Sequence, residues 1–130
     1  VLSFVDSVGR VRAPNVAILP TWSIDTATVV TGQFRYYNPT GTSLTLRGWT
    51  VAAGGTAPSG ADLIVNPKLD GTALFASGSR PRITSGSRYS GLVTAMTTTT
   101  WPANSYLTVD VDQIGSTQAG TKITIQAIAY

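Results

Sequence analysis

Residue types that build catalytic and metal sites are missing from this sequence. Its 130 residues include no cysteine, no histidine and no glutamate, and charged residues make up only 12%. The absence of cysteine excludes disulfides and thiolate metal ligands, and the absence of histidine excludes Ser-His-Asp and Cys-His nucleophile systems. The paired carboxylates of a glycosidase would have to come from six aspartates. We therefore expect neither an enzyme nor a cofactor.

Helical, membrane-spanning and nucleotide-binding patterns are missing as well. No stretch places apolar residues at helical spacing without an intervening glycine or proline, which argues against helices. No apolar run reaches the roughly 18 residues of a membrane span, the first residues do not form a signal peptide, and no glycine-rich phosphate loop is present. The formal net charge is +3, but the arginines form only small groups. We expect no contact with membranes or nucleic acid.

The sequence does contain alternating strands, most clearly near its end. Between residues 105 and 112 apolar and polar residues alternate, and the same period returns between residues 121 and 128, after the loop GSTQAG. A period of two is typical of strands with one buried face. We predict an antiparallel hairpin in which Val109 points inward and Asp110 points outward.

Turn signals divide the rest of the chain into short strands. Asn-Pro-Thr-Gly at 38–41 and Asp-Gly at 70–71 are the clearest turns. The further predicted strands are 27–37 paired with 43–52 as a hairpin, 61–66, 72–76, 80–86 at an edge, and 89–96. This spacing predicts one all-β domain over residues 21–130, a single antiparallel β-sandwich, and the long crossovers favour a jelly roll.

Residues 1–20 differ from the rest of the sequence. Their apolar stretches are short, and Pro14 and Pro20 interrupt them, as expected of edge strands or an extended arm. Short apolar pieces of this kind do not bury well alone. We predict an N-terminal arm that contacts a second subunit or a larger assembly, with Arg10 and Arg12 at the interface.

Two sets of charged residues leave alternatives open. Asp110 and Asp112 share one strand face, so they could hold a cation or act as an acid-base pair. We favour the alternative that both are solvated residues, which keep the strand from associating edge to edge. Arg80, Arg82 and Arg88 could lie on outward faces and loop rims, which we also favour, or could bind an acidic partner. No metal site is expected.

Aromatic residues are the remaining candidates for binding. Tyr36 and Tyr37 are adjacent in a predicted strand, so their rings point to opposite faces and one of them lies outward. In a regular strand Trp49 falls on the face opposite Leu44 and Leu46. These rings could pack in the core or across strands. An outward tyrosine and tryptophan on neighbouring strands would instead form a binding patch.

Three runs of the sequence share features with a known kind of module. They are GTAPSGADLIVNPKLDGTALF from residue 55, RPRITSG from residue 80 and WPANSYLTVDVDQIGSTQAGTKITI from residue 101, with DVDQIGS the most specific part. Together they resemble a β-sandwich module of tailed-bacteriophage virion proteins, whereas the first fifty residues carry no such resemblance. The module occurs on tail fibres, baseplates and capsid exteriors, so the resemblance implies a virion surface protein.

The size of the chain favours one role within that class. A small single module without coiled-coil heptads or shaft repeats suits a protein added to a shell in many copies. We expect a capsid decoration protein, made in the host cytoplasm, that forms a homotrimer on the capsid exterior, contacts the major capsid protein and stabilises capsomer junctions. The alternative is a tail-fibre or baseplate module that binds host-surface carbohydrate through its aromatic and arginine residues.

Overall fold

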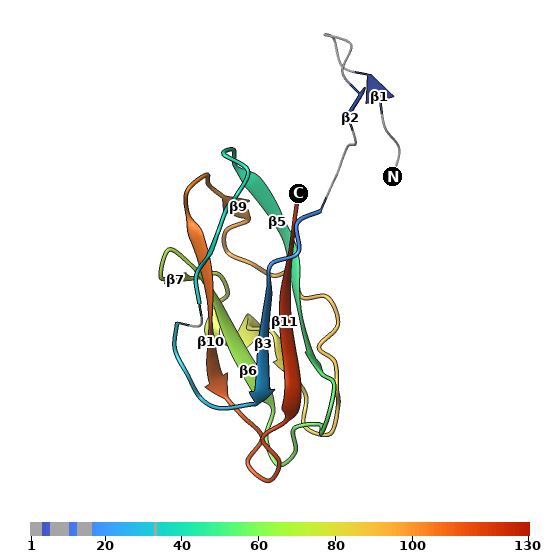
Figure 1. The fold of residues 1–130 in the computed structure, drawn as a ribbon. Helices are drawn as coiled ribbons and strands as arrows, with labels where there is room; N and C mark the ends of the chain where they lie inside the picture. The colour runs from blue at the N-terminus through green and yellow to red at the C-terminus, as the bar shows by residue number, and fades with distance from the viewer. Residues whose placement is uncertain (1–3, 6–10, 13–16, 33) are drawn as a thin grey trace.

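The computed structural model describes residues 4–5, 11–12, 17–32 and 34–130. Within them the fold is all-β (Figure 1), and the only helix there is a single 3₁₀ turn at Ser77–Ser79. The strands are β1 Phe4–Val5, β2 Val11–Arg12, β3 Thr21–Thr26, β4 Tyr36–Tyr37, β5 Leu44–Ala53, β6 Leu63–Leu69, β7 Thr72–Ala73, β8 Arg82–Ile83, β9 Thr100–Trp101, β10 Tyr106–Gln113 and β11 Thr121–Ala129. The prediction of an all-β fold is confirmed.

Two antiparallel sheets enclose the core. One sheet has the strand order β3-β11-β5-β9, and the other has the order β4-β10-β6-β7, with β8 also paired to β6. Every strand pair is antiparallel. The inward side chains of both sheets belong to one buried hydrophobic cluster, so the arrangement is sandwich-like. This single core is what holds the sheets together, because burying apolar area is the main stabilising term in folding.

Three tryptophans fill much of the core. Trp22, Trp49 and Trp101 each have at most 1% of their surface exposed, and the rings of Trp22 and Trp49 stack with centroids 5.7 Å apart. The prediction that Trp49 lies on the face opposite Leu46 is wrong because β5 contains a bulge. Leu46 pairs with Ala129 and Gly48 pairs with Ile128, which leaves one extra residue in β5 between them. A bulge shifts the alternation by one position, so Leu46 and Trp49 both point inward.

The predicted hairpin at the end of the chain is also wrong, although both of its strands exist. β10 pairs with β4 and β6, whereas β11 pairs with β3 and β5 in the other sheet. The loop between them therefore crosses from one sheet to the other. Alternation establishes that each strand has one buried face, but it does not identify the neighbouring strand.

Two further predicted strands are broken in the structure. Residues 27–37 do not form a hairpin with β5: Val30 makes an isolated bridge to Val111, and only Tyr36–Tyr37 forms a strand, beside β10. The chain leaves β3 there and crosses to the other sheet. Residues 89–96 likewise make only isolated bridges, from Tyr89 and Val93 to β5.

The turn at residues 70–71 is confirmed. Asp70 and Gly71 both have positive φ, 49° and 85°, and they join β6 to β7. Two successive positive φ values match the right-handed twist of the strands that such a turn connects. The predicted edge at residues 80–86 is also confirmed, because β8 pairs only with the start of β6.

The first residues form a small sheet of their own. β1 pairs with β2, and Figure 1 shows this pair beyond the end of the two larger sheets. Most of the predicted N-terminal arm lies outside the described residues, and so does Arg10. For Arg12 the structure gives the backbone of β2 but no side-chain environment. The arm therefore stays a prediction.

Candidate interaction surfaces

The three aromatic residues predicted at an interface separate into different environments. Trp49 is fully buried, and Tyr36 is half-buried, with its ring 6.1 Å from that of Trp22 and 6.2 Å from that of Trp101. Tyr37 is 51% exposed. The prediction that adjacent tyrosines point to opposite faces is confirmed, whereas a patch that combines tyrosine with Trp49 does not form.

The three arginines that follow β7 are held by intramolecular contacts. Each is bound to an acceptor of this chain. Arg80 pairs with Asp112 at 2.6 Å, Arg82 pairs with Asp62 at 3.7 Å, and Arg88 donates to the carbonyl of Gly55. Arg80 and Arg82 lie at the edge of the β10-β6 sheet, whereas Arg88 lies beside the end of β5 in the other sheet.

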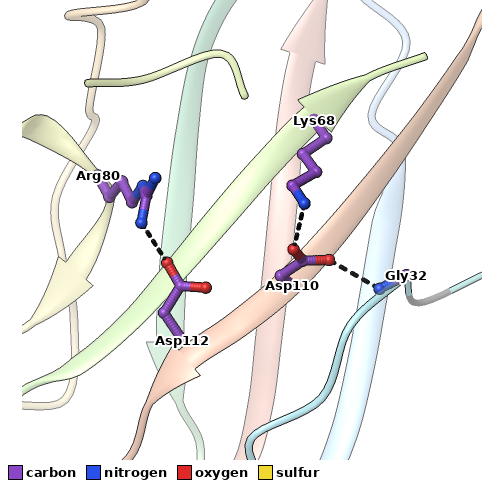
Figure 2. Close-up of polar contacts among 5 residues, drawn as sticks. All are labelled: Gly32, Lys68, Arg80, Asp110 and Asp112. Carbon is purple, nitrogen blue, oxygen red and sulfur yellow. Dashed lines mark hydrogen bonds and ion pairs between the residues drawn. The ribbon is translucent and has the colours of Figure 1, made fainter. Parts of the chain in front are cut away.

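Asp110 and Asp112 have separate partners, as Figure 2 shows. The carboxylate of Asp110 accepts a hydrogen bond from the backbone amide of Gly32 at 2.7 Å and pairs with Lys68 at 2.7 Å. Asp112 pairs with Arg80 instead. The expectation that Asp110 is solvated is wrong: only 4% of it is exposed, and Gly32 and Lys68 both contact its carboxylate.

The outward side of the β3-β11-β5 sheet is free of charge over most of its area. Cross-strand pairing aligns Thr21 with Gln126 and Thr50, and Ser23 with Thr124 and Ala52. We call this surface the uncharged face; its residues are Leu19, Thr21, Ser23, Thr50, Ala52, Tyr89, Leu92, Thr124, Gln126 and Ile128. It contains no ionisable side chain other than the Tyr89 phenol.

Large apolar side chains lie exposed on the uncharged face. Leu19, Leu92 and Tyr89 are 48%, 57% and 59% exposed. Leu92 rests on Gly48, where a Cβ atom would come within 2.5 Å of its Cδ1 atom. Exposed apolar groups gathered on one sheet face, rather than scattered, are typical of surfaces that bind another macromolecule.

Charged groups border the uncharged face at both ends. At one end the guanidinium of Arg47 lies 4.3 Å from the centre of the Tyr130 ring. At the other, Lys122 pairs with Asp25 at 3.0 Å, beside a shallow hollow of about 270 Å³ between β3 and β11. An uncharged centre with a charged rim is the composition that protein interfaces show.

The other sheet carries a polar cleft of about 290 Å³ on its outward side. It lies between the chain leading into β4, the floor formed by β6 and β10, and the β6–β7 turn. The lining residues of this polar cleft are Thr31, Gly32, Arg35, Lys68, Gly71, Tyr106, Thr108 and Asp110. Two of them, Thr108 and Asp110, are buried at 7% and 4% exposure, so they form the floor.

Arg35 stands at the rim of the polar cleft. Its guanidinium lies 4.3 Å from the centre of the Tyr106 ring, within the range of a cation–π contact. The hydrogen bond with the Tyr37 side chain, followed by the charge interaction with Tyr106, raises the pKa of Arg35 above its ordinary value. Arg35 is therefore a fixed positive charge held by aromatic rings.

The described residues give no sign of a metal centre or a membrane span. Among them no three aspartates or other metal-binding side chains gather closely enough to hold an ion. No helix in that part of the chain is long and apolar enough to cross a membrane. Comparisons with family models, curated proteins and solved structures returned no match for this chain.

Sequence reasoning missed most residues of both surfaces. The uncharged face could have been found from the alternation in β3 and β11, whose outward positions are uncharged apart from Asp25 and Lys122 at one end. Arg35 and Lys68 come together only because the chain before β4 folds across β10. That contact joins residues far apart in the sequence, and no local pattern predicts it.

Proposed function

We propose that this protein is a structural protein of a tailed-bacteriophage virion, a capsid decoration protein that docks on the outer shell through the uncharged face. The observation that supports this most is the composition of that face: Leu19, Leu92 and Tyr89 are exposed on it, and no charged side chain interrupts it. The buried centres of protein interfaces are depleted in charge and enriched in aromatic residues. Such a face suits docking on a broad protein surface, and the outside of a shell is a surface of that kind.

The strand order supports a jelly roll, a fold found in viral capsid proteins. The first strands of the sheets pair with the last ones in mirror order: β3 with β11, β4 with β10, β5 with β9, and β6 with β7. A long hairpin rolled up into two sheets produces this set of pairs. We propose this fold for residues 21–130.

We further propose that the protein acts by binding and not by catalysis. We also propose that it forms a homotrimer on the capsid exterior, with its N-terminal arm at the subunit or shell contact. The aspartates support a non-catalytic role, because Asp110 and Asp112 are each neutralised by a cation and serve the fold. The pairing of β1 with β2 supports the proposed subunit contact, since a two-stranded sheet by itself is marginally stable in water. The major capsid protein would be the second partner.

A charge placed on the uncharged face tests the docking proposal. Thr124 is exposed at the centre of the face, so Thr124→Arg should leave the fold intact but bury an unpaired charge on docking. We expect the affinity for shells assembled from the major capsid protein of the same phage to fall at least roughly tenfold, measured by co-sedimentation.

Thr84→Arg is the matched control. Thr84 is exposed next to β8 in the other sheet, so the same change should leave shell binding unaltered. If both variants bound the shells as well as the unmodified protein, the uncharged face would not be the docking surface. If the unmodified protein did not bind the shells at all, the decoration role itself would fail.

The polar cleft favours the second candidate, a module that binds host-surface carbohydrate. Its floor and rim offer hydroxyl, carboxylate and guanidinium groups in one concave site, the groups that recognise sugars by hydrogen bonding. This role would use the sheet opposite the uncharged face, so the two roles do not compete for the same residues.

A further inference from the structure

The polar cleft has a rigid floor. The Asp110 carboxylate is nearly fully buried and is fixed on both oxygens, by Lys68 and by the backbone amide of Gly32. A buried carboxylate with these partners holds the segment before β4 against the sheet (Figure 2). The cleft lies between that segment and the β6–β7 turn. Each carboxylate oxygen has a second lone pair, so Asp110 can still accept a hydrogen bond from a ligand hydroxyl.

Arg35 supplies a positive charge at the rim that no carboxylate of the described residues neutralises. Among the described residues it has no carboxylate within ion-pair distance, unlike Lys68, Arg80, Arg82 and Lys122. The guanidinium carbon lies over the Tyr106 ring, and a guanidinium has five N–H donors, so donors remain for a ligand. This fork of donors matches a carboxylate in a bidentate pair.

The remaining lining groups suit hydroxyls. Thr31 and Thr108 offer hydroxyl groups that can both donate and accept, and Lys68 offers further donors. Lys68 neutralises Asp110, so the charged lining groups leave one net positive charge, that of Arg35, which matches a singly charged ligand better than a doubly charged phosphate. A volume of about 290 Å³ is near the lower end of ligand sites, about 300 Å³, so it accommodates one small ring and not a chain.

We propose that the polar cleft binds a small acidic saccharide, a single sugar ring that bears a carboxylate. Arg35 pairs with the carboxylate, and the ring hydroxyls contact Thr31, Thr108, Lys68 and the floor carboxylate of Asp110. The ligand is thus defined by one negative charge at the rim and by hydroxyls toward the floor. This proposal is independent of shell docking, because it uses the other sheet.

NMR titration of the protein tests the proposal. Galacturonic acid and N-acetylneuraminic acid are the probes, with neutral galactose and inorganic phosphate as comparisons, and the amides of Gly32, Tyr106 and Thr108 report on the cleft. We expect the acidic sugars to shift these amides and to bind at least tenfold more tightly than galactose. Arg35→Ala should weaken that binding roughly ten- to hundredfold, as expected for a charged hydrogen-bonded pair.

Arg47→Ala is the matched control, because Arg47 makes the same 4.3 Å contact with a tyrosine ring on the other sheet. It should leave sugar binding unchanged, and so should Thr124→Arg. The proposal is overturned if no acidic sugar shifts the cleft amides, if galactose or phosphate binds as tightly, or if Arg35→Ala behaves like Arg47→Ala. Loss of shell docking in Thr124→Arg with intact sugar binding would separate the two proposals.

Discussion

Asp110 is the residue whose environment departs most from its position in the sequence. In a strand that alternates regularly, it occupies the solvent side, yet only 4% of it is exposed. A charge in such a place is tolerated only when it is paired and hydrogen-bonded, and Asp110 has both kinds of partner, Lys68 and the Gly32 amide. It therefore ties the chain before β4 to the centre of the sheet.

Removal of this carboxylate should destabilise the fold. We expect Asp110→Ala to lower the free energy of unfolding by about 2–3 kcal/mol, because it leaves the Gly32 amide and the half-exposed Lys68 without their acceptor. Asp112→Ala breaks a more solvated pair with Arg80 and should cost less than about 1 kcal/mol. Urea denaturation of both variants measures the difference, and equal losses would contradict the burial of Asp110.

At the scale of elements, the loop before β6 packs against the loop between β10 and β11 at one end of the sheets. Ser59, in the loop before β6, bridges to Gln118 in the loop between β10 and β11. Gly115 lies so close to this contact that a Cβ atom there would overlap the Gln118 carbonyl, at 1.8 Å, and would come within 2.7 Å of the Ser59 amide. The glycine is required by this close backbone approach.

This packing predicts different effects of alanine at two glycines. Gly115→Ala forces backbone apart and should cost about 3 kcal/mol or more of stability. At Gly78 an added Cβ atom would meet nothing within 4 Å, so Gly78→Ala should change stability by less than about 0.5 kcal/mol. Thermal unfolding followed by circular dichroism distinguishes them, and a Gly115→Ala protein as stable as the control would show that the two loops do not pack as described.

Elements were predictable from the sequence where the signal is local. The Asp70–Gly71 turn, the strands β10 and β11 and the all-β class depend on turn chemistry and on a period of two, which neighbouring residues determine. Strand partners depend on which sheet a crossover reaches, and the inward position of Trp49 depends on the bulge opposite β11. The polar cleft depends on the strand partners and on the crossover before β4, because it is assembled from three separate segments.

At the scale of the whole molecule, charge is divided between the two sheets. Three of the ion pairs of the described residues, Lys68–Asp110, Arg80–Asp112 and Arg82–Asp62, lie with the β10-β6 sheet, and Lys122–Asp25 lies at the end of the other. The uncharged face and the polar cleft therefore point in opposite directions. A molecule with these two sides can attach to a shell by one sheet and present the other outward.

A cryo-electron microscopy reconstruction of intact particles carrying the protein tests this account most directly, because it gives the orientation of the two sheets on the shell. The account predicts density for the protein on the capsid exterior, with β3, β11 and β5 against the shell and the polar cleft facing outward. Density in which the β4-β10-β6 sheet lies against the shell, or particles with the protein on the tail and none on the capsid, would contradict it.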